Sequence, residues 1–322
     1  MKKPLIILTG PTAVGKTALS IELAKAIGGE IISADSMQVY RHMDVGSAKV
    51  TKEEMQGVPH HLIDVLDPDE EFNVTRFQAM AKEAMDGIYA RGHVPIIAGG
   101  TGFYIQALIY DIDFKENDDS TAMREELESL GEEKGNEHLH DILREIDPES
   151  AEAIHANNRK RVIRAIEYYR MTGQKISEHN QEEREKSSPY DFYYYVLTCD
   201  RGLLYERIDQ RVDLMLDMGL VDEGQKLKSM GCRRGMVSMQ GLGYKEILDY
   251  LDGICTLEEA VYVLKRDTRH FAKRQLTWFK RERDVRWLEL EQFDSDRNKV
   301  LEYMLEDYNK GRKIENGIGT DV

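Results

Sequence analysis

The sequence predicts an α/β fold of three layers, in which helices cover both faces of a parallel sheet and a helical insertion domain interrupts the chain. Three observations predict it. Short apolar strands alternate with helices through the first third of the chain, as is typical of parallel sheets. A glycine-rich loop joins the first strand to the first helix. A highly charged stretch without strand signals follows Phe114, and a strand-like run resumes at Tyr190.

The expected elements follow this order along the chain. Apolar runs predict strands at residues 5–9, 30–34 and 94–98, and helical punctuation and periodicity predict helices at 16–27, 74–91 and 103–109. After the charged stretch we expect a strand at 190–198 and helices at 203–230, 245–251 and 257–283. The expected domains are a core of residues 1–114 and 189–310, a helical insertion of residues 115–188, and a polar tail of residues 311–322.

Composition excludes several classes of protein. With 322 residues, 41% hydrophobic and 32% charged, the chain can bury a sizeable core and is not mainly disordered. Its aliphatic runs are too short to span a membrane. Cys199, Cys232 and Cys255 are widely separated and form no Cys-x-x-Cys pair, which argues against disulfides and a zinc site. We therefore expect a cytoplasmic monomer that does not associate with membranes.

Residues 10–17, GPTAVGKT, match the pattern G-x-x-x-x-G-K-[ST] directly after a strand and at the start of a helix. Glycines let consecutive N–H groups turn inward, and the helix N-terminus adds a positive field. Lys16 would neutralise phosphate oxygens, and the Thr17 hydroxyl would ligate Mg²⁺. The fold is therefore expected to be P-loop NTPase-like. The expected phosphate-binding residues are Gly10, Pro11, Thr12, Ala13, Val14, Gly15, Lys16 and Thr17.

One part of a hydrolytic P-loop site is missing. In ATPases and GTPases a hydrophobic strand ends in an acidic residue that holds Mg²⁺. Here the strand at 94–98 is followed by Gly99, Gly100, Thr101 and Gly102, and no guanine-reading Asn-Lys-x-Asp sequence follows. A motor or switch ATPase is therefore disfavoured, and the loop is expected to hold a di- or triphosphate without hydrolysing it.

Two further residues come at the ends of predicted strands. The strand at 30–34 is followed by Asp35, and Thr101 follows the strand at 94–98. The carboxyl ends of parallel strands meet at one edge of the sheet, so both side chains are expected near the bound phosphates. Asp35 is either a proton acceptor for an incoming nucleophile or a helix N-cap. Thr101 either reaches a phosphate oxygen or belongs to a plain turn.

Basic residues cluster in a protein whose net charge is −15. Residues 265–283 carry eight basic and two acidic residues with interleaved aromatics, and smaller clusters lie at 157–164 and 233–245. Such patches bind a phosphodiester backbone and stack unpaired bases. The alternative is a solvated helix face whose aromatic residues pack on the core. Arg207 and Arg211, one helical turn apart, either reach a phosphate or pair with acidic residues of their own helix.

Taken together, six segments resemble the bacterial tRNA dimethylallyltransferases, also called tRNA isopentenyltransferases. They are GPTAVGKT, SADSMQVYRHMDVGSAK, GGTGFY, NNRKRVIRAIEYY, RVDLMLDMGL and KRQLTWFK, in this order from Leu5 to about Trp287. The resemblance implies transfer of a dimethylallyl group from dimethylallyl diphosphate to N6 of the adenine on the 3′ side of the tRNA anticodon. The partners it implies are tRNA and the prenyl diphosphate, with Mg²⁺ as cofactor.

The family's residue roles carry over to matching positions of this chain. The resemblance implies that the P-loop binds the donor diphosphate, that Mg²⁺ is held at Thr17, and that Asp35 takes the proton from the adenine amine. It places Lys16, Thr101 and Arg211 on the diphosphate near the leaving oxygen. The insertion domain is expected to contact tRNA. The implied tRNA-binding residues are Asp35, Ser36, Met37, Gln38, Thr101, Arg159, Lys160, Arg161, Val162, Ile163, Gln240, Gly241, Leu242, Gly243, Tyr244, Lys245, Lys273, Arg274, Gln275, Trp278 and Lys280.

Other functions remain open at this level. A P-loop small-molecule kinase would explain residues 10–35 with ATP as donor, but it would leave the basic segment at 265–283 unused. A prenyltransferase acting on free adenine nucleotides would not require intact tRNA. A non-catalytic RNA-binding protein would use a nucleotide only as a structural ligand.

Overall fold

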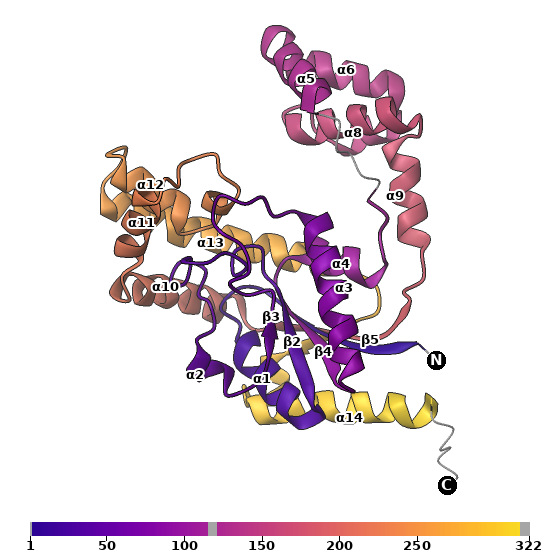
Figure 1. The fold of residues 1–322 in the computed structure, drawn as a ribbon, viewed down its shortest axis with the longest axis vertical. Coiled ribbons are helices and arrows are strands. Elements are labelled where there is room, and N and C mark those ends of the chain that lie inside the picture. The colour runs from indigo at the N-terminus through magenta and orange to yellow at the C-terminus, as the bar shows by residue number, and fades with distance from the viewer. Residues whose placement is uncertain (1, 115–120, 316–322) are drawn as a thin grey trace. The chain divides into compact units, whose positions relative to one another are not determined.

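The computed structural model describes residues 2–114 and 121–315, and its secondary structure confirms the predicted α/β class (Figure 1). The chain divides into two compact units, residues 1–109 with 189–322 and residues 110–188. None of the helices in the described part of the chain combines the length and the apolar character that a membrane span requires.

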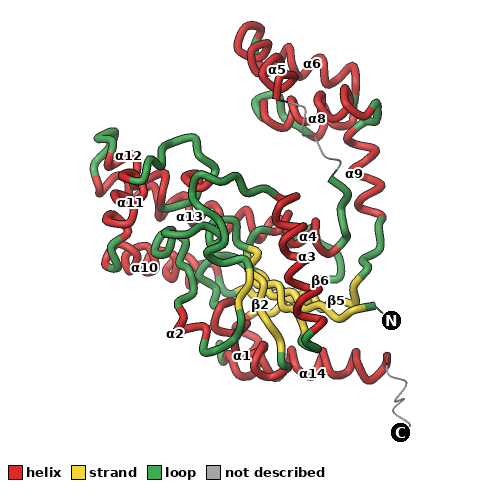
Figure 2. Tube along the Cα trace, viewed as in Figure 1, coloured by secondary structure: helices red, strands yellow, loops and turns green. Residues whose placement is uncertain are grey.

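The first unit is built on one six-stranded sheet in the order β3-β2-β4-β1-β5-β6, in which all pairs are parallel (Figure 2). The strands are β1 (Lys3–Thr9), β2 (Gly29–Ala34), β3 (His60–His61), β4 (Val94–Gly99), β5 (Tyr190–Thr198) and β6 (Val285–Glu289). Strand β4 therefore lies between β1 and β2, so the strands that lead to the P-loop and to Asp35 are not neighbours.

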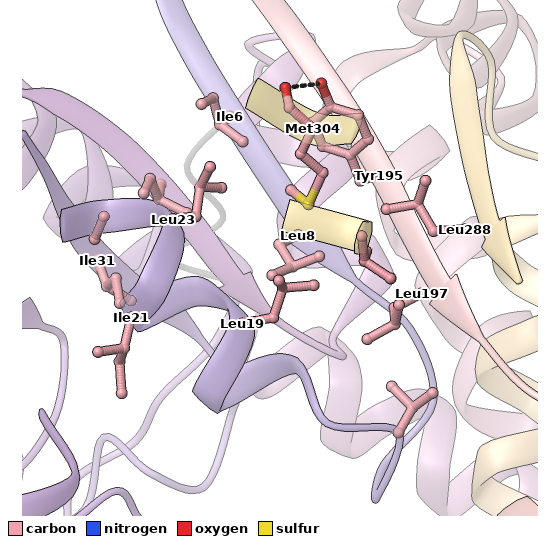
Figure 3. Packing of buried hydrophobic residues seen from close by; sticks show 14 of the residues in the cluster. Ile6, Leu8, Leu19, Ile21, Leu23, Ile31, Tyr195, Leu197, Leu288 and Met304 are labelled. Carbon is pink, nitrogen blue, oxygen red and sulfur yellow. Dashed lines mark hydrogen bonds between the residues drawn. The ribbon is translucent and has the colours of Figure 1, made fainter. Parts of the chain in front are cut away.

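Helices pack on the sheet because its side chains alternate between two faces. Ile6 and Leu8 of β1 contact one hydrophobic cluster together with α1 (Lys16–Ile27) and α14 (Arg297–Glu315). Figure 3 shows Leu19 of α1 and Met304 of α14 in this cluster. Helices α3 (Val74–Ala90) and α4 (Gly102–Ile109) pack against each other, and α3 also contacts β2 and β4.

The remaining helices of this unit form a separate apolar cluster around Val212, Leu220, Ile247 and Leu264. They are α10 (Arg201–Asp217), α11 (Leu220–Ser229), α12 (Tyr244–Leu251) and α13 (Leu257–Phe279). Short elements complete the unit: α2 (Lys52–Met55), η1 (Ser238–Gln240) and η2 (Leu290–Phe293).

The inserted unit contains only helices among its described residues. They are α5 (Thr121–Lys134), α6 (Asn136–Ile146), α7 (Pro148–Ala153), α8 (Arg159–Thr172) and α9 (Ile176–Glu185). Leu127, Leu139, Leu143 and Val162 are fully buried in its own hydrophobic core. The buried Glu167 accepts two hydrogen bonds from Arg124, at 3.0 and 2.8 Å.

Three sequence expectations differ from the structure. The single helix expected at 203–230 is two helices, because the chain turns at Gly219, whose φ of 91° is in the left-handed region. Strands β3 and β6 were not predicted, since one has two residues and the other follows a helix without a strong apolar run. The polar tail was expected from residue 311, but α14 continues to Glu315, and residues 316–322 lie outside the described residues.

A buried charge network holds the amino-terminal end of β2. The Glu30 side chain is 2% exposed and accepts hydrogen bonds from Arg91 at 2.8 and 2.7 Å. Ring nitrogens of His61 and His93 each lie 2.7 Å from its carboxylate oxygens. The Arg91 hydrogen bonds, followed by those of the two histidines, lower the pKa of Glu30 to about 2 against the effect of burial.

We predict that this network stabilises the fold in a pH-dependent way. A carboxyl group with a lowered folded-state pKa contributes stability above its unfolded pKa, and loses it as the pH falls through the folded value. A change from 4.5 to about 2 corresponds to about 3 kcal/mol. Urea unfolding of wild type and Glu30→Gln should show a difference of this order at pH 6 that shrinks steadily towards pH 3. A difference independent of pH would contradict this interpretation.

Candidate active site

The P-loop connects β1 to α1 and has a glycine with a positive φ at each end. Gly10 has a φ of 146°, and a Cβ at this position would collide with the carbonyl oxygen of Leu197 on β5. Gly15, with a φ of 104°, caps α1 without any side-chain hydrogen bond. The first turn of α1 therefore presents its N–H groups and the positive end of its dipole to the loop.

Lys16 lies inside the loop. Its Nζ donates to the carbonyl oxygens of Gly10 and Pro11, at 3.0 and 2.7 Å. Burial and, to a smaller extent, the charge of Arg211 lower the pKa of Lys16 to about 7, whereas the Asp35 carboxylate opposes this change. The charges of Arg211 on α10 and of Asp35 after β2 therefore both act on Lys16.

Asp35 and Thr101 also come together at the carboxyl edge of the sheet. The Thr101 N–H donates to the carbonyl oxygen of Ala34 at 3.1 Å, so the loop after β4 is held next to Asp35. One oxygen of Asp35, Oδ1, accepts from the N–H groups of Met37 and Gln38, at 2.8 and 3.4 Å. The segment after Asp35 is a turn and not a helix, so Asp35 caps a turn with one oxygen rather than a helix.

Gln275 of α13 joins the two loops of the site. Its Oε1 accepts from the N–H of Thr12 in the P-loop at 2.9 Å, and its Nε2 donates to the carbonyl oxygen of Gly100 at 3.0 Å. The side chain is 6% exposed, and a Cβ on Gly100 would collide with its Nε2. The family resemblance implies that Gln275 binds tRNA. In the structure both ends of its side-chain amide form hydrogen bonds within the protein.

The P-loop opens into a cavity of about 450 Å³. Its lining includes Lys16 and Thr17 of α1 and Arg211 of α10. Burial lowers the pKa of Arg211, and the charges of Asp35 and Glu54 act in the opposite direction. A cavity that combines a helix N-terminus with several cationic side chains is suited to a polyphosphate anion.

The turn after Asp35 contacts a second segment expected to bind tRNA. A Cβ on Gly241 would lie 2.7 Å from Sδ of Met37, so residues 35–38 and 240–245 pack together. The amide of Gln38 accepts from Ser33 Oγ at 3.1 Å and donates to the carbonyl oxygens of residues 47 and 48. Tyr244 is 1% exposed. The side chains of Gln38 and Tyr244 therefore stabilise the backbone of these two segments.

The basic residues of α13 divide into two groups. In its first half, Lys265 pairs with Asp213 at 2.5 Å and Arg269 pairs with Asp209 at 2.5 Å. In its second half Lys273 and Arg274 are exposed, as is Lys280 directly after the helix, and among the described residues none of the three has an ion-pair partner. In the first half of α13 the basic residues form ion pairs within the protein, which fits the interpretation as a charged helix face without a ligand. In the second half the basic side chains are exposed to solvent.

Aromatic side chains lie beside the second half of α13. The Trp278 indole packs over Gly102 so closely that a Cβ there would collide with it. Phe103, which is 40% exposed, contacts Trp278 edge to face with 6.1 Å between ring centroids. This contact places an exposed aromatic surface next to the loop that carries Thr101.

Within the inserted unit, the predicted tRNA segment 159–163 opens α8. Arg159 donates to Asn136 Oδ1 at 2.7 Å and to a backbone carbonyl, while Val162 and Ile163 are buried in the core of the unit. Lys160 and Arg161 are exposed. Of this segment, Lys160 and Arg161 are therefore the side chains that offer charge to a ligand.

The sequence reasoning did not single out Glu223 of α11. Its carboxylate accepts from the N–H groups of residues 44, 45 and 46 at 2.8, 2.8 and 2.9 Å, and from the Tyr244 hydroxyl at 2.8 Å. It thus fixes the loop that follows the Asp35 turn. No sequence signal marks it, because a single glutamate on an amphipathic helix is ordinarily a solvated surface residue.

Comparison with known proteins identifies the family. Residues 38–282 match the model of the family described as IPP transferase. The chain belongs to the IPP transferase family. Residues 3–71 of this transferase also match the model described as isopentenyl transferase. The resemblance inferred from the six sequence segments is therefore confirmed.

Relatives of the transferase match over nearly its full length. The tRNA dimethylallyltransferase of Lachnoclostridium phytofermentans is 64% identical over 93% of this chain and 96% of its own. That of Acetivibrio thermocellus is 52% identical over 94% and 97%.

Solved structures agree with these sequence matches. The tRNA isopentenylpyrophosphate transferase of Bacillus halodurans is 45% identical, with a TM-score of 0.73, over 98% of this chain and all of its own. A eukaryotic dimethylallyltransferase, described as acting on tRNA, is 30% identical, with a TM-score of 0.83, over 96% of this chain and 80% of its own.

We predict that Gln275→Ala lowers the free energy of unfolding by about 2 kcal/mol, because it removes both hydrogen bonds of a buried amide and leaves the part-buried Thr12 N–H and Gly100 carbonyl without their partner. Urea unfolding measures this loss. The neighbouring exposed Arg274→Ala is the matched control and should change stability by less than about 0.5 kcal/mol. Equal effects of the two substitutions would show that Gln275 does not hold the loops together.

Proposed function

We propose that this transferase moves a dimethylallyl group from dimethylallyl diphosphate to N6 of the adenine on the 3′ side of the tRNA anticodon, releasing diphosphate. The observation that carries the proposal is the convergence of an anion-binding loop, two cations and a carboxylate at one edge of the sheet. In the reaction the allylic C–O bond breaks, a C–N bond forms, and one proton leaves the amine. The diphosphate retains the electrons of the broken bond.

The P-loop is proposed to hold the donor diphosphate. Its N–H groups, Lys16, Arg211 and Thr101 would stabilise the negative charge that grows on the departing oxygen, an effect worth several kcal/mol in a preorganised site. Thr17 is exposed in the first turn of α1, and its hydroxyl with diphosphate oxygens is a donor set that suits Mg²⁺. When bound there, the ion would supply further charge neutralisation.

Asp35 is proposed to accept the proton of the adenine amine. An exocyclic amine is a poor nucleophile because its lone pair is delocalised into the ring, so removing the proton as the C–N bond forms assists the attack. The hydrogen bonds to Oδ1 hold the carboxylate in a fixed orientation. We propose that Oδ2 faces the amine.

The exposed second half of α13 is proposed to hold the tRNA backbone through Lys273, Arg274 and Lys280, with Lys160 and Arg161 of the inserted unit as further contacts. An anticodon loop suits this site because its bases are unpaired, so the adenine leaves its stack at less cost than in a duplex. We also propose that the enzyme acts in the cytoplasm, as a monomer.

A kinase remains the alternative that the P-loop by itself allows, but the family and its relatives do not favour it. Incubation with dimethylallyl diphosphate and unmodified tRNA, followed by nucleoside analysis, tests the proposal directly. The expected product is N6-dimethylallyl adenosine. A parallel incubation with labelled ATP and candidate acceptors should give no phosphoryl transfer, and transfer without prenylation would overturn the proposal.

We predict that Asp35→Asn lowers kcat by about 10²- to 10⁴-fold, the usual contribution of a general base. Asparagine keeps an oxygen for the N–H groups of Met37 and Gln38, so the turn should persist and the tRNA dissociation constant should change by less than about threefold. Single-turnover prenylation and filter binding measure the two quantities. Turnover equal to that of the wild type would remove Asp35 from the mechanism.

We predict that Lys273→Ala and Lys280→Ala weaken tRNA binding without destabilising the fold. If each lysine contacts a phosphate, each substitution should reduce the slope of log K against log salt by about one. Lys265→Ala is the matched control, because Lys265 is already paired with Asp213. A control slope that falls as far as the other two would assign their effect to net charge alone.

A further inference from the structure

The cavity beside the P-loop extends beyond the residues that the proposed reaction uses. In addition to Lys16, Thr17 and Arg211, it is lined by Glu22 on the second turn of α1, by Arg207 of α10 and by Arg297 of α14. Its volume of about 450 Å³ leaves room for more than one diphosphate group. These three additional residues therefore come from α1 itself, from α10 and from α14.

The charged residues of the additional lining are two arginines, Arg207 and Arg297, and two glutamates, Glu22 and Glu54. Arg207 lies one turn before Arg211 on α10, so both project from the same face of that helix. Among the described residues Arg207 has no ion-pair partner. Arg297 pairs through Nε with Oε1 of Glu22 at 3.0 Å, whereas Oε2 of Glu22 is buried without a hydrogen-bond partner in the described structure. Glu54 also lines the cavity, and its Oε2 accepts from the N–H of Thr51 at 2.8 Å. Arg207 is therefore the guanidinium group of this lining that is available to an anion.

We propose that Arg207 and Arg297 form an outer anion subsite, which holds a phosphate group next to the one bound by the P-loop. The ligand class is a condensed phosphate chain longer than a diphosphate. Guanidinium groups bind phosphate oxygens through paired hydrogen bonds, and the Arg207 group is available to do so. The inference rests on the proposed function in one respect, namely that the P-loop holds a diphosphate.

Glu22 determines how accessible the outer subsite is. Its carboxylate competes with an incoming phosphate for Arg297 and repels the anion. Removing its charge while keeping its shape should therefore strengthen binding, whereas removing the charge of Arg207 should weaken it. A purely structural role of these residues would not produce effects of opposite sign.

Calorimetric titration with inorganic diphosphate and inorganic tripolyphosphate, at fixed free Mg²⁺, tests the subsite. The wild type should bind tripolyphosphate about tenfold more tightly than diphosphate. Arg207→Gln should abolish most of this advantage and leave diphosphate binding within about threefold of the wild type. Glu22→Gln should increase the advantage. Arg201→Gln, an exposed arginine on the same helix outside the cavity lining, should leave both affinities unchanged.

The outcomes separate the subsite from the donor site. If the wild type binds diphosphate but prefers tripolyphosphate no more than Arg207→Gln does, the outer subsite is overturned and the proposed donor site stands. If the wild type binds neither anion, both proposals fall. Melting temperatures of all variants within a few degrees of the wild type show that the fold is retained. Equal losses in Arg201→Gln and Arg207→Gln would also overturn the subsite, because they would reflect net charge.

Discussion

The hydrogen bonds of Gln275 join parts of the site that lie far apart in the chain. One amide connects α13 to Thr12 in the P-loop and to Gly100 in the loop after β4. The anion-binding loop, the Thr101 loop and the exposed half of the basic helix are therefore fixed relative to one another. Since a buried amide with unsatisfied ends is costly, a shift of any of these three segments carries a penalty. The chemistry proposed for the site depends on this rigidity.

Among the described residues, the basic residues of α13 are paired in one half of the helix and unpaired in the other. The protein is strongly acidic overall, with a net charge of −15, yet α13 is rich in basic residues. Its first half is neutralised by acidic residues of α10, among them Asp209 and Asp213. In its second half, beside the Thr101 loop, Lys273 and Arg274 are exposed and have no ion-pair partner among the described residues. A nucleic-acid ligand would thus be attracted to the part of the helix that leads to the site, and repelled from most of the remaining surface.

Much of the site could be predicted from the sequence because its signals are local. The pattern around Lys16 specifies a strand, a turn and a helix within a few residues, and Asp35 and Thr101 each follow an apolar run. The internal hydrogen bonds of Gln275 could not be predicted, because its partners lie 263 and 175 residues away. The ion pair between Lys265 and Asp213 could not be predicted from the sequence either, because it forms only when α10 and α13 pack together.

The sequence by itself determined the α/β class, the glycine-rich loop between β1 and α1, and the family, because short-range backbone geometry and ordered motifs carry that information. Only the tertiary structure decided that β4 separates β1 from β2, that Gly219 divides one long helix into two, and which basic side chains remain unpaired. These features arise from long-range pairing and packing. The local sequence of a strand or helix would allow it to pair or pack with several others. Burial of apolar side chains and complementary charges in the folded chain decide which of these it contacts.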